Sequence, residues 1–187
     1  MKKPSNSDVI QTEWRKIAFS AAMVMRMAGN YDLFCELTGA GDSAVFGNIL
    51  NLVWESVSGQ NQRIDFQKQQ QKLELITPNP AEFDMYGVWP ALDAAVALTS
   101  LLNVCERWDQ AELDSIVTLS NSTIERYLEA VGDECVDTHP LLMSEQASIK
   151  QLQAIIREGV SLSRPRVVVS LKTAVSDSGV TNIGLEV

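Results

Sequence analysis

The stretch from Ala81 to Arg107 constrains the fold more than any other part of the chain, because it is the longest strongly apolar run. After Pro90 it contains no residue that breaks a helix. On a helix of 100° per residue, its polar side chains fall within an arc of about 140°; they are Asp93, Thr99, Ser100, Asn103, Glu106 and Arg107. The remaining wide apolar face must be covered on most sides, so the sequence predicts a central buried helix over residues 88–107.

This helix is not expected to cross a membrane. Its apolar part is shorter than the about 20 residues that span a bilayer, and Asp93 interrupts it. We therefore expect a soluble protein with no membrane partner.

The rest of the chain shows helical periodicity with clear start and stop signals. Helix N-caps are common at positions such as those of Asp42, Asn79, Asp109 and the residue before Pro140, and a further helix is predicted to begin at Asp65. The predicted helices are 13–28, 31–37, 43–58, 65–76, a short one from Pro80 that ends at a left-handed Gly87, 88–107, 109–131, 140–158 and 163–176. For residues 167–169, which are β-branched, a strand is the alternative.

The predicted fold class is therefore all-α: an irregular single-domain bundle of about seven to eight helices around the central apolar helix. One helical domain over residues 1–187 is the simplest division of a chain of this length. We expect residues 1–12 to be loosely ordered, and residues 180–187 to form a short extended tail on the bundle.

Three separated motifs carry a resemblance to a known family. They are FDMYGVWPALDAAVAL at 83–98, NYDLFCELTGAGD at 30–42 followed by ILNLVWE at 49–55, and TNIG at 181–184. In this order they resemble the YjaG-like family of bacterial proteins, catalogued as a domain of unknown function. The resemblance implies an all-helical bacterial domain and no catalytic residues. The segment Arg164-Pro165-Arg166 departs from the uninterrupted helix expected there.

Composition excludes some classes of function. The net charge of −9 and the pI near 4.6 leave no basic face for phosphates, so nucleic-acid binding is not expected. Cys35, Cys105 and Cys135 have no metal or redox spacing, which favours reduced thiols in a cytoplasmic protein. No apolar run follows the two N-terminal lysines, so we expect no signal peptide.

The sequence offers no convincing catalytic or metal-binding set. His139 precedes Pro140 and is interpreted as a helix-start residue, and GAGD at 39–42 as a turn followed by an N-cap. Asp42, Glu55, Asp84 and Asp93 are the carboxylates near the motifs, where structural roles are the simpler interpretation. We therefore predict no catalytic residues, no bound metal and no cofactor.

A mixed acidic and aromatic pocket is the alternative to purely structural roles. Its candidate residues are Trp54, Glu55, Asp84, Tyr86, Trp89 and Asp93. If they surround one cavity, an enzyme or a small-molecule-binding protein is favoured. If they are dispersed, a non-enzymatic binding or adaptor protein is favoured, and this is the function that the sequence predicts.

Two surfaces are candidate binding sites for a protein partner. Phe19, Met23 and Met27 form an apolar ridge on the helix face opposite the inferred core, which is covered either by the same chain or by a second subunit in a homodimer. Residues 106–145 carry ten acidic side chains and two arginines, so they form either a solvated face or a docking site for a basic protein. The identity of any protein partner stays unknown at this stage.

Overall fold

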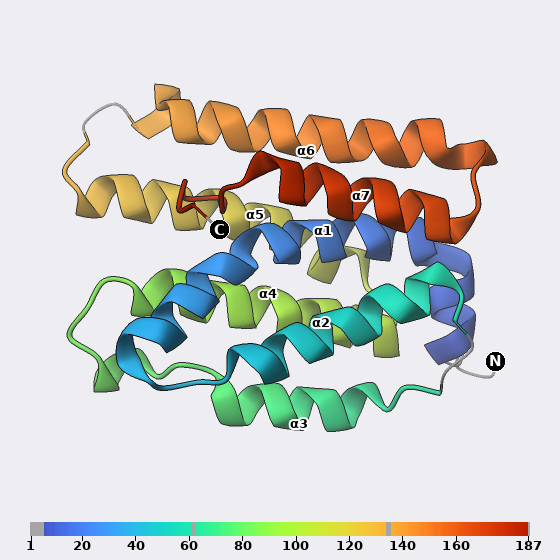
Figure 1. Ribbon diagram of the computed structural model, residues 1–187, viewed down its shortest axis with the longest axis horizontal. Coiled ribbons are helices and arrows are strands. Elements are labelled where there is room, and N and C mark those ends of the chain that lie inside the picture. Colours follow the sequence, from blue (N-terminus) through green and yellow to red (C-terminus); the bar gives the residue numbers. More distant parts are fainter. Residues whose placement is uncertain (1–5, 61–62, 134–135, 187) are drawn as a thin grey trace.

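The computed structural model describes residues 6–60, 63–133 and 136–186, and the described chain folds into α-helices joined by short turns (Figure 1). These ranges contain seven α-helices and three short 3₁₀ segments: α1 (Asn6–Thr38), α2 (Ser43–Ser58), α3 (Phe66–Ile76), η1 (Pro80–Glu82), α4 (Val88–Glu106), α5 (Gln110–Ala130), η2 (Val136–Thr138), α6 (Pro140–Glu158), η3 (Gly159–Ser161) and α7 (Arg164–Ser178). The predicted all-α fold is confirmed.

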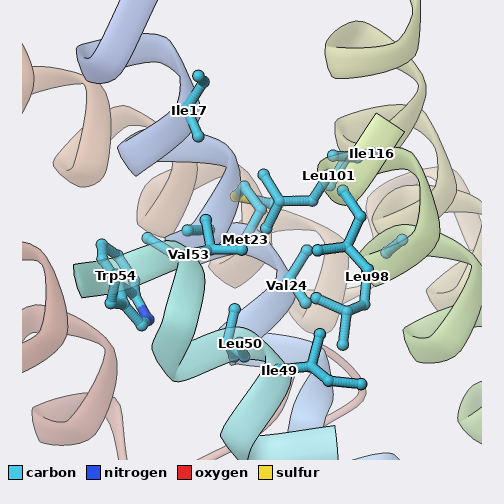
Figure 2. Close-up of a cluster of buried hydrophobic side chains, with 14 of the residues drawn as sticks. Ile17, Met23, Val24, Ile49, Leu50, Val53, Trp54, Leu98, Leu101 and Ile116 are labelled. Atoms are coloured by element: carbon cyan, nitrogen blue, oxygen red, sulfur yellow. The ribbon is translucent and has the colours of Figure 1, made fainter. Parts of the chain in front are cut away.

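The central helix is α4. It packs most extensively against α1, and also against α5 and α3. By length and composition it is apolar enough to cross a membrane, but 67% of its apolar window is buried inside the protein. In Figure 2, Leu98 and Leu101 of α4 face Met23 and Val24 of α1 and Ile49 of α2. α4 is therefore the core helix of a soluble bundle, as predicted.

The other helices lie on two sides of the α1–α4 pair. In Figure 1, α6 and α7 lie along one side and α2 and α3 along the other, with α5 beside α4. α2 contacts both α3 and α7, so it forms a bridge between the two groups. This placement gives α2 an inner face toward the core and an outer face flanked by two helices.

Helix starts follow the predicted local signals closely. The side chains of Asp42, Asp65 and Asp109 accept hydrogen bonds from the backbone N–H groups of Val45, Lys68 and Ala111, at 2.9, 3.0 and 2.9 Å. Gly39 and Gly41 in the turn before Asp42 have positive φ angles of 68° and 76°. These positions confirm the turn and the N-caps that the sequence predicts at Asp42 and Asp109, whereas Asp65 is the N-cap of α3 rather than its first residue.

The segment before α4 differs from its prediction. Asn79 caps a 3₁₀ segment that ends at Glu82 rather than a helix that reaches Gly87. Gly87 itself has a right-handed φ of −57° and directly precedes α4. The prediction that a left-handed Gly87 ends a helix was therefore wrong, because the chain enters α4 through a right-handed turn at this residue.

The largest correction concerns α1. The sequence predicted a stop at Gly29-Asn30, but one helix runs from Asn6 to Thr38. Asn30 is buried inside it, and its side-chain amide donates a hydrogen bond of 2.9 Å to Oδ1 of Asn182. Packing against α4 and the C-terminal segment therefore outweighs the local cost of glycine in a helix, which is about 1 kcal/mol. Residues 6–12 are also helical, with Val9 buried, whereas residues 1–5 lie outside the described part.

The C-terminal part is helical where a strand was the alternative. α7 covers residues 167–169, and Gly179 ends it in a left-handed conformation with φ of 63°. The tail then turns back on itself through an isolated antiparallel bridge between Val180 and Glu186. It therefore lies on the bundle as a folded turn with buried residues, rather than as a plain extended segment.

The central position of α4 predicts a strong dependence of stability on its inner side chains. Leu98→Ala removes a fully buried side chain, and should lower the free energy of unfolding by about 2–5 kcal/mol. Val96→Ala, on the 43% exposed side of the same helix, is the matched control and should cost less than about 1 kcal/mol. Chemical denaturation followed by circular dichroism measures both. Equal losses would contradict the burial of α4.

Candidate functional site

The six candidate pocket residues do not surround one cavity. Trp54 and Glu55 line a groove on the outer side of α2, and this groove does not include Asp84, Tyr86, Trp89 or Asp93. Trp89 is 43% exposed and Asp84 is exposed, whereas Asp93 is buried. The structure therefore divides the set into a groove pair and a group around the start of α4.

The groove is a wide, open concave feature of the described surface on the outer side of α2. Its floor is the outer face of α2, and its walls come from α3 and α7. Its volume is about 1110 Å³. Leu75 on the α3 wall is 87% exposed and Val169 on the α7 wall is 62% exposed. The groove therefore presents large apolar side chains that nothing in the described chain covers.

Few charged side chains line this groove. They are Glu55 on the floor, Lys72 on the α3 wall and Lys172 on the α7 wall. The ammonium nitrogen of Lys172 lies 5.6 Å from the ring centroid of Trp54, within reach of a cation–π attraction. Trp54 is 3% exposed, and its indole N–H has no acceptor among the described residues. The accessible lining of the groove is thus mainly apolar, with uncharged polar side chains such as Asn48 and Gln69 and three separated charges.

Asp93 belongs to an ion pair between α4 and α5. Its Oδ2 accepts a hydrogen bond of 2.7 Å from the Thr123 hydroxyl and pairs with the Arg126 guanidinium. Burial raises the pKa of the nearby Tyr86 phenol, whose ring lies 6.0 Å from that of Tyr127. Asp93 is only 5% exposed, because α5 covers it. The ion pair joins α4 to α5.

The apolar ridge of α1 lies inside the protein. Met23 and Met27 are fully buried, and both belong to the main core cluster. Phe19 is half-buried and lines a small cleft of about 240 Å³ between α1, α5 and α6. The same chain therefore covers the ridge, and it is not available as a homodimer surface. The homodimer itself stays a prediction.

Sequence analysis missed a buried polar network around Arg26. The guanidinium donates two hydrogen bonds to Oε2 of Glu145, at 3.0 and 2.7 Å, and both side chains are almost completely buried. Oε1 of Glu145 accepts a third, of 2.7 Å, from the Ser120 hydroxyl. Asn182 of the TNIG motif donates to the backbone carbonyl of Ser120 at 3.2 Å. The network ties α1, α5, α6 and the C-terminal turn together.

A signal for this network was present but ambiguous. Arg26 stands between Met25 and Met27, but a single arginine on a helix is usually solvated. Its acidic partner is 119 positions away, so no local pattern connects them. Because each charge is paired and hydrogen-bonded, the arrangement is that of a structural ion pair, and the site has no free group for catalysis.

The remaining candidate groups have local roles. His139 caps α6, since its Nδ1 accepts a hydrogen bond of 3.1 Å from the backbone N–H of Leu141. Burial raises the pKa of the Cys105 thiol, and Cys35 is also free, whereas Cys135 lies outside the described residues. Within the described ranges, no three His, Cys, Asp or Glu side chains are grouped closely enough to hold a metal ion.

Together these features define a soluble seven-helix protein, counted over the described residues, with a buried ion pair and an open apolar groove. The sequence matches the model of the family described as "Protein of unknown function (DUF416)" over residues 10–186, so the chain belongs to this family. This agrees with the YjaG-like resemblance of its motifs.

Individual relatives cover 92% or more of the chain. The uncharacterized protein YjaG of Escherichia coli K12 is 30% identical over 92% of this chain and 90% of its own length. An uncharacterized protein of Haemophilus influenzae is 31% identical over 100% of this chain and 98% of its own. The crystal structure of a DUF416 family protein from Shewanella baltica has the same fold, with a TM-score of 0.87 and 33% identity over 99% of this chain and 100% of that one.

The buried ion pair predicts a strong and non-additive effect on stability. Arg26→Met or Glu145→Leu alone leaves a buried charge without its partner, and each should cost about 3–5 kcal/mol of unfolding free energy. The double variant removes both charges and should cost clearly less than the sum. Lys16→Met is the control, because its ion pair with Glu13 is exposed at 55% and 29% and its loss should cost about 1 kcal/mol or less. Urea denaturation measures all four variants; small, additive losses at Arg26 and Glu145 would contradict the network.

Proposed function

We propose that this protein is a non-enzymatic binding protein of the adaptor type, acting in the cytoplasm. Its binding site is the groove between α2, α3 and α7, and the bound element is an amphipathic helix of a protein partner. The observation that carries this proposal is the apolar groove with Leu75 and Val169 exposed on opposite walls. Reduced cysteines and acidic composition support the cytoplasmic location.

The size of the groove favours a helix over a small molecule. Pockets for drug-sized ligands measure about 300–1,000 Å³ and enclose most of the ligand surface. This groove exceeds that range at about 1110 Å³, and its wall side chains stand in solvent. A helix laid along it would cover these side chains by packing its apolar face between two existing helices, as helix-in-groove complexes do.

The dispersal of the acidic and aromatic candidate residues also favours a protein-binding function over an enzyme pocket. An enzyme with a carboxylate and aromatic pocket needs Glu55, Tyr86 and Asp93 around one cavity. Glu55 lines the groove, whereas Asp93 is committed to Thr123 and Arg126. The groove therefore supports the binding function, and the commitment of Asp93 to an ion pair weakens the support for a shared carboxylate and aromatic pocket.

The proposal predicts that groove variants lose their partner without losing the fold. Leu75→Asp and Val169→Asp change exposed side chains and should alter the unfolding free energy by about 0.5 kcal/mol or less. Each should reduce partner recovery by about tenfold or more, because a charge replaces an apolar contact at the centre of the surface. The measurement is quantitative affinity capture from the native bacterium, with the partner identified by mass spectrometry.

Matched controls use exposed apolar residues elsewhere. Val131→Asp and Met143→Asp change side chains that are 61% and 63% exposed and lie outside the groove. They should retain the partner at the level of the unchanged protein. Equal recovery by groove and control variants would reject the groove as the binding site.

A further inference from the structure

We infer, on the basis of the proposed function, that the helix held in the groove is acidic, with carboxylates on both flanks of its apolar face. The charge distribution of the chain carries this inference. Eight of the nine net negative charges come from residues 106–145, which hold ten acidic side chains and two arginines. This segment contains α5 and the start of α6, and none of its residues lines the groove.

The charge balance of the groove is the opposite of that in residues 106–145. Two of the three charged side chains that line it are lysines, one on each wall, so it is locally positive on an acidic protein. Neither Lys72 nor Lys172 has a carboxylate partner among the described residues. The cation–π contact with Trp54 keeps the Lys172 ammonium close to the floor. A helix in the groove would therefore meet one unpaired cation on each side.

The positions of these side chains determine which sequence pattern the bound helix of the partner needs. Apolar residues at positions i, i+3, i+4 and i+7 would contact Leu52, Leu75 and Val169, which line the floor and the two walls. Glutamate or aspartate beside this stripe would pair with the two lysines. α2 has 16 residues, so the floor is about 24 Å long and takes a partner segment of about 10–16 residues. Glu55 is the single acid on the floor, and it disfavours an acid at the centre of the apolar stripe.

The test is a selection from a displayed library of 16-residue amphipathic helices. The library fixes a leucine stripe and randomises the flanking positions among Glu, Lys and Gln. Binders are selected on the full-length protein and counter-selected on the Leu75→Asp variant, so that the enriched sequences depend on the groove. The expected result is enrichment of Glu on both flanks, by about tenfold over Lys at the same positions.

The second part of the test reverses the charge of groove residues in the protein. For the selected helix, Lys72→Glu with Lys172→Glu should weaken binding about tenfold or more, and the loss should shrink as salt is raised. Lys150→Glu changes an exposed lysine of α6 outside the groove and is the control. These lysines are at least partly exposed, so the variants are expected to fold, and circular dichroism verifies this. Binding is followed through the indole N–H resonance of Trp54, which lies under the groove floor.

The outcomes separate this inference from the function on which it rests. Groove-dependent helices with neutral or basic flanks would overturn the acidic partner and leave the helix-binding function standing. No groove-dependent helix at all would overturn both. A saturable shift of the Trp54 resonance by oleate alone, without any enriched helix, would assign the groove to a small amphiphile and also overturn both.

Discussion

The packing of α1 against α4 is the interaction on which the rest of the structure depends. α4 is apolar on most of its circumference, and alanines at positions 91, 94, 95 and 97, all fully buried, let neighbouring backbones approach closely. α1 is the longest helix of the described chain, and it supplies Met23, Val24 and Met27 to the same core cluster. Once this pair is formed, α5 covers the Asp93 side of α4, and α2 covers the opposite side of the pair with Ile49 and Val53. The outer face of α2 then forms the floor of the groove that we propose as the binding site.

Local signals predicted the helix boundaries, and long-range contacts explain the misses. The side chains that cap helices accept hydrogen bonds from backbone N–H groups only two or three residues along the chain, so sequence alone identified these helix starts. They are Asp42, Asp65, Asp109 and His139. The continuation of α1 through Gly29, by contrast, depends on Asn182, which is 152 positions from Asn30. The pairing of Arg26 with Glu145 and the burial of Asp93 have the same origin. A charged residue on a helix face looks solvated until the covering helix is known.

The motifs that carried the family resemblance have mainly structural roles in this fold. Tyr31 of the motif at 30–42 accepts a hydrogen bond from the backbone N–H of Asp42 at 3.1 Å and donates one of 2.7 Å to the carbonyl of Ile76. Phe34 of the same motif packs edge-on against Phe83 of the motif at 83–98, with ring centroids 4.9 Å apart. Asn30 contacts Asn182 of the TNIG motif. The segment 49–55 differs, because Glu55 and Leu52 face the groove above Trp54. Sequence analysis singled out Trp54 and Glu55, but the walls from α3 and α7 are brought to them only by folding.

Site-specific photo-cross-linking in the native bacterium shows directly whether the α2–α3–α7 groove holds a helix of another protein, as we propose. A photoreactive residue is placed at Leu52 in the groove, and at Glu125 on the exposed side of α5 for comparison. The account predicts that position 52 cross-links to one protein, with the linked residues spaced three or four apart along a single segment, as on one face of a helix. Cross-links of equal yield from both positions, or linked residues scattered over unrelated proteins, would contradict it.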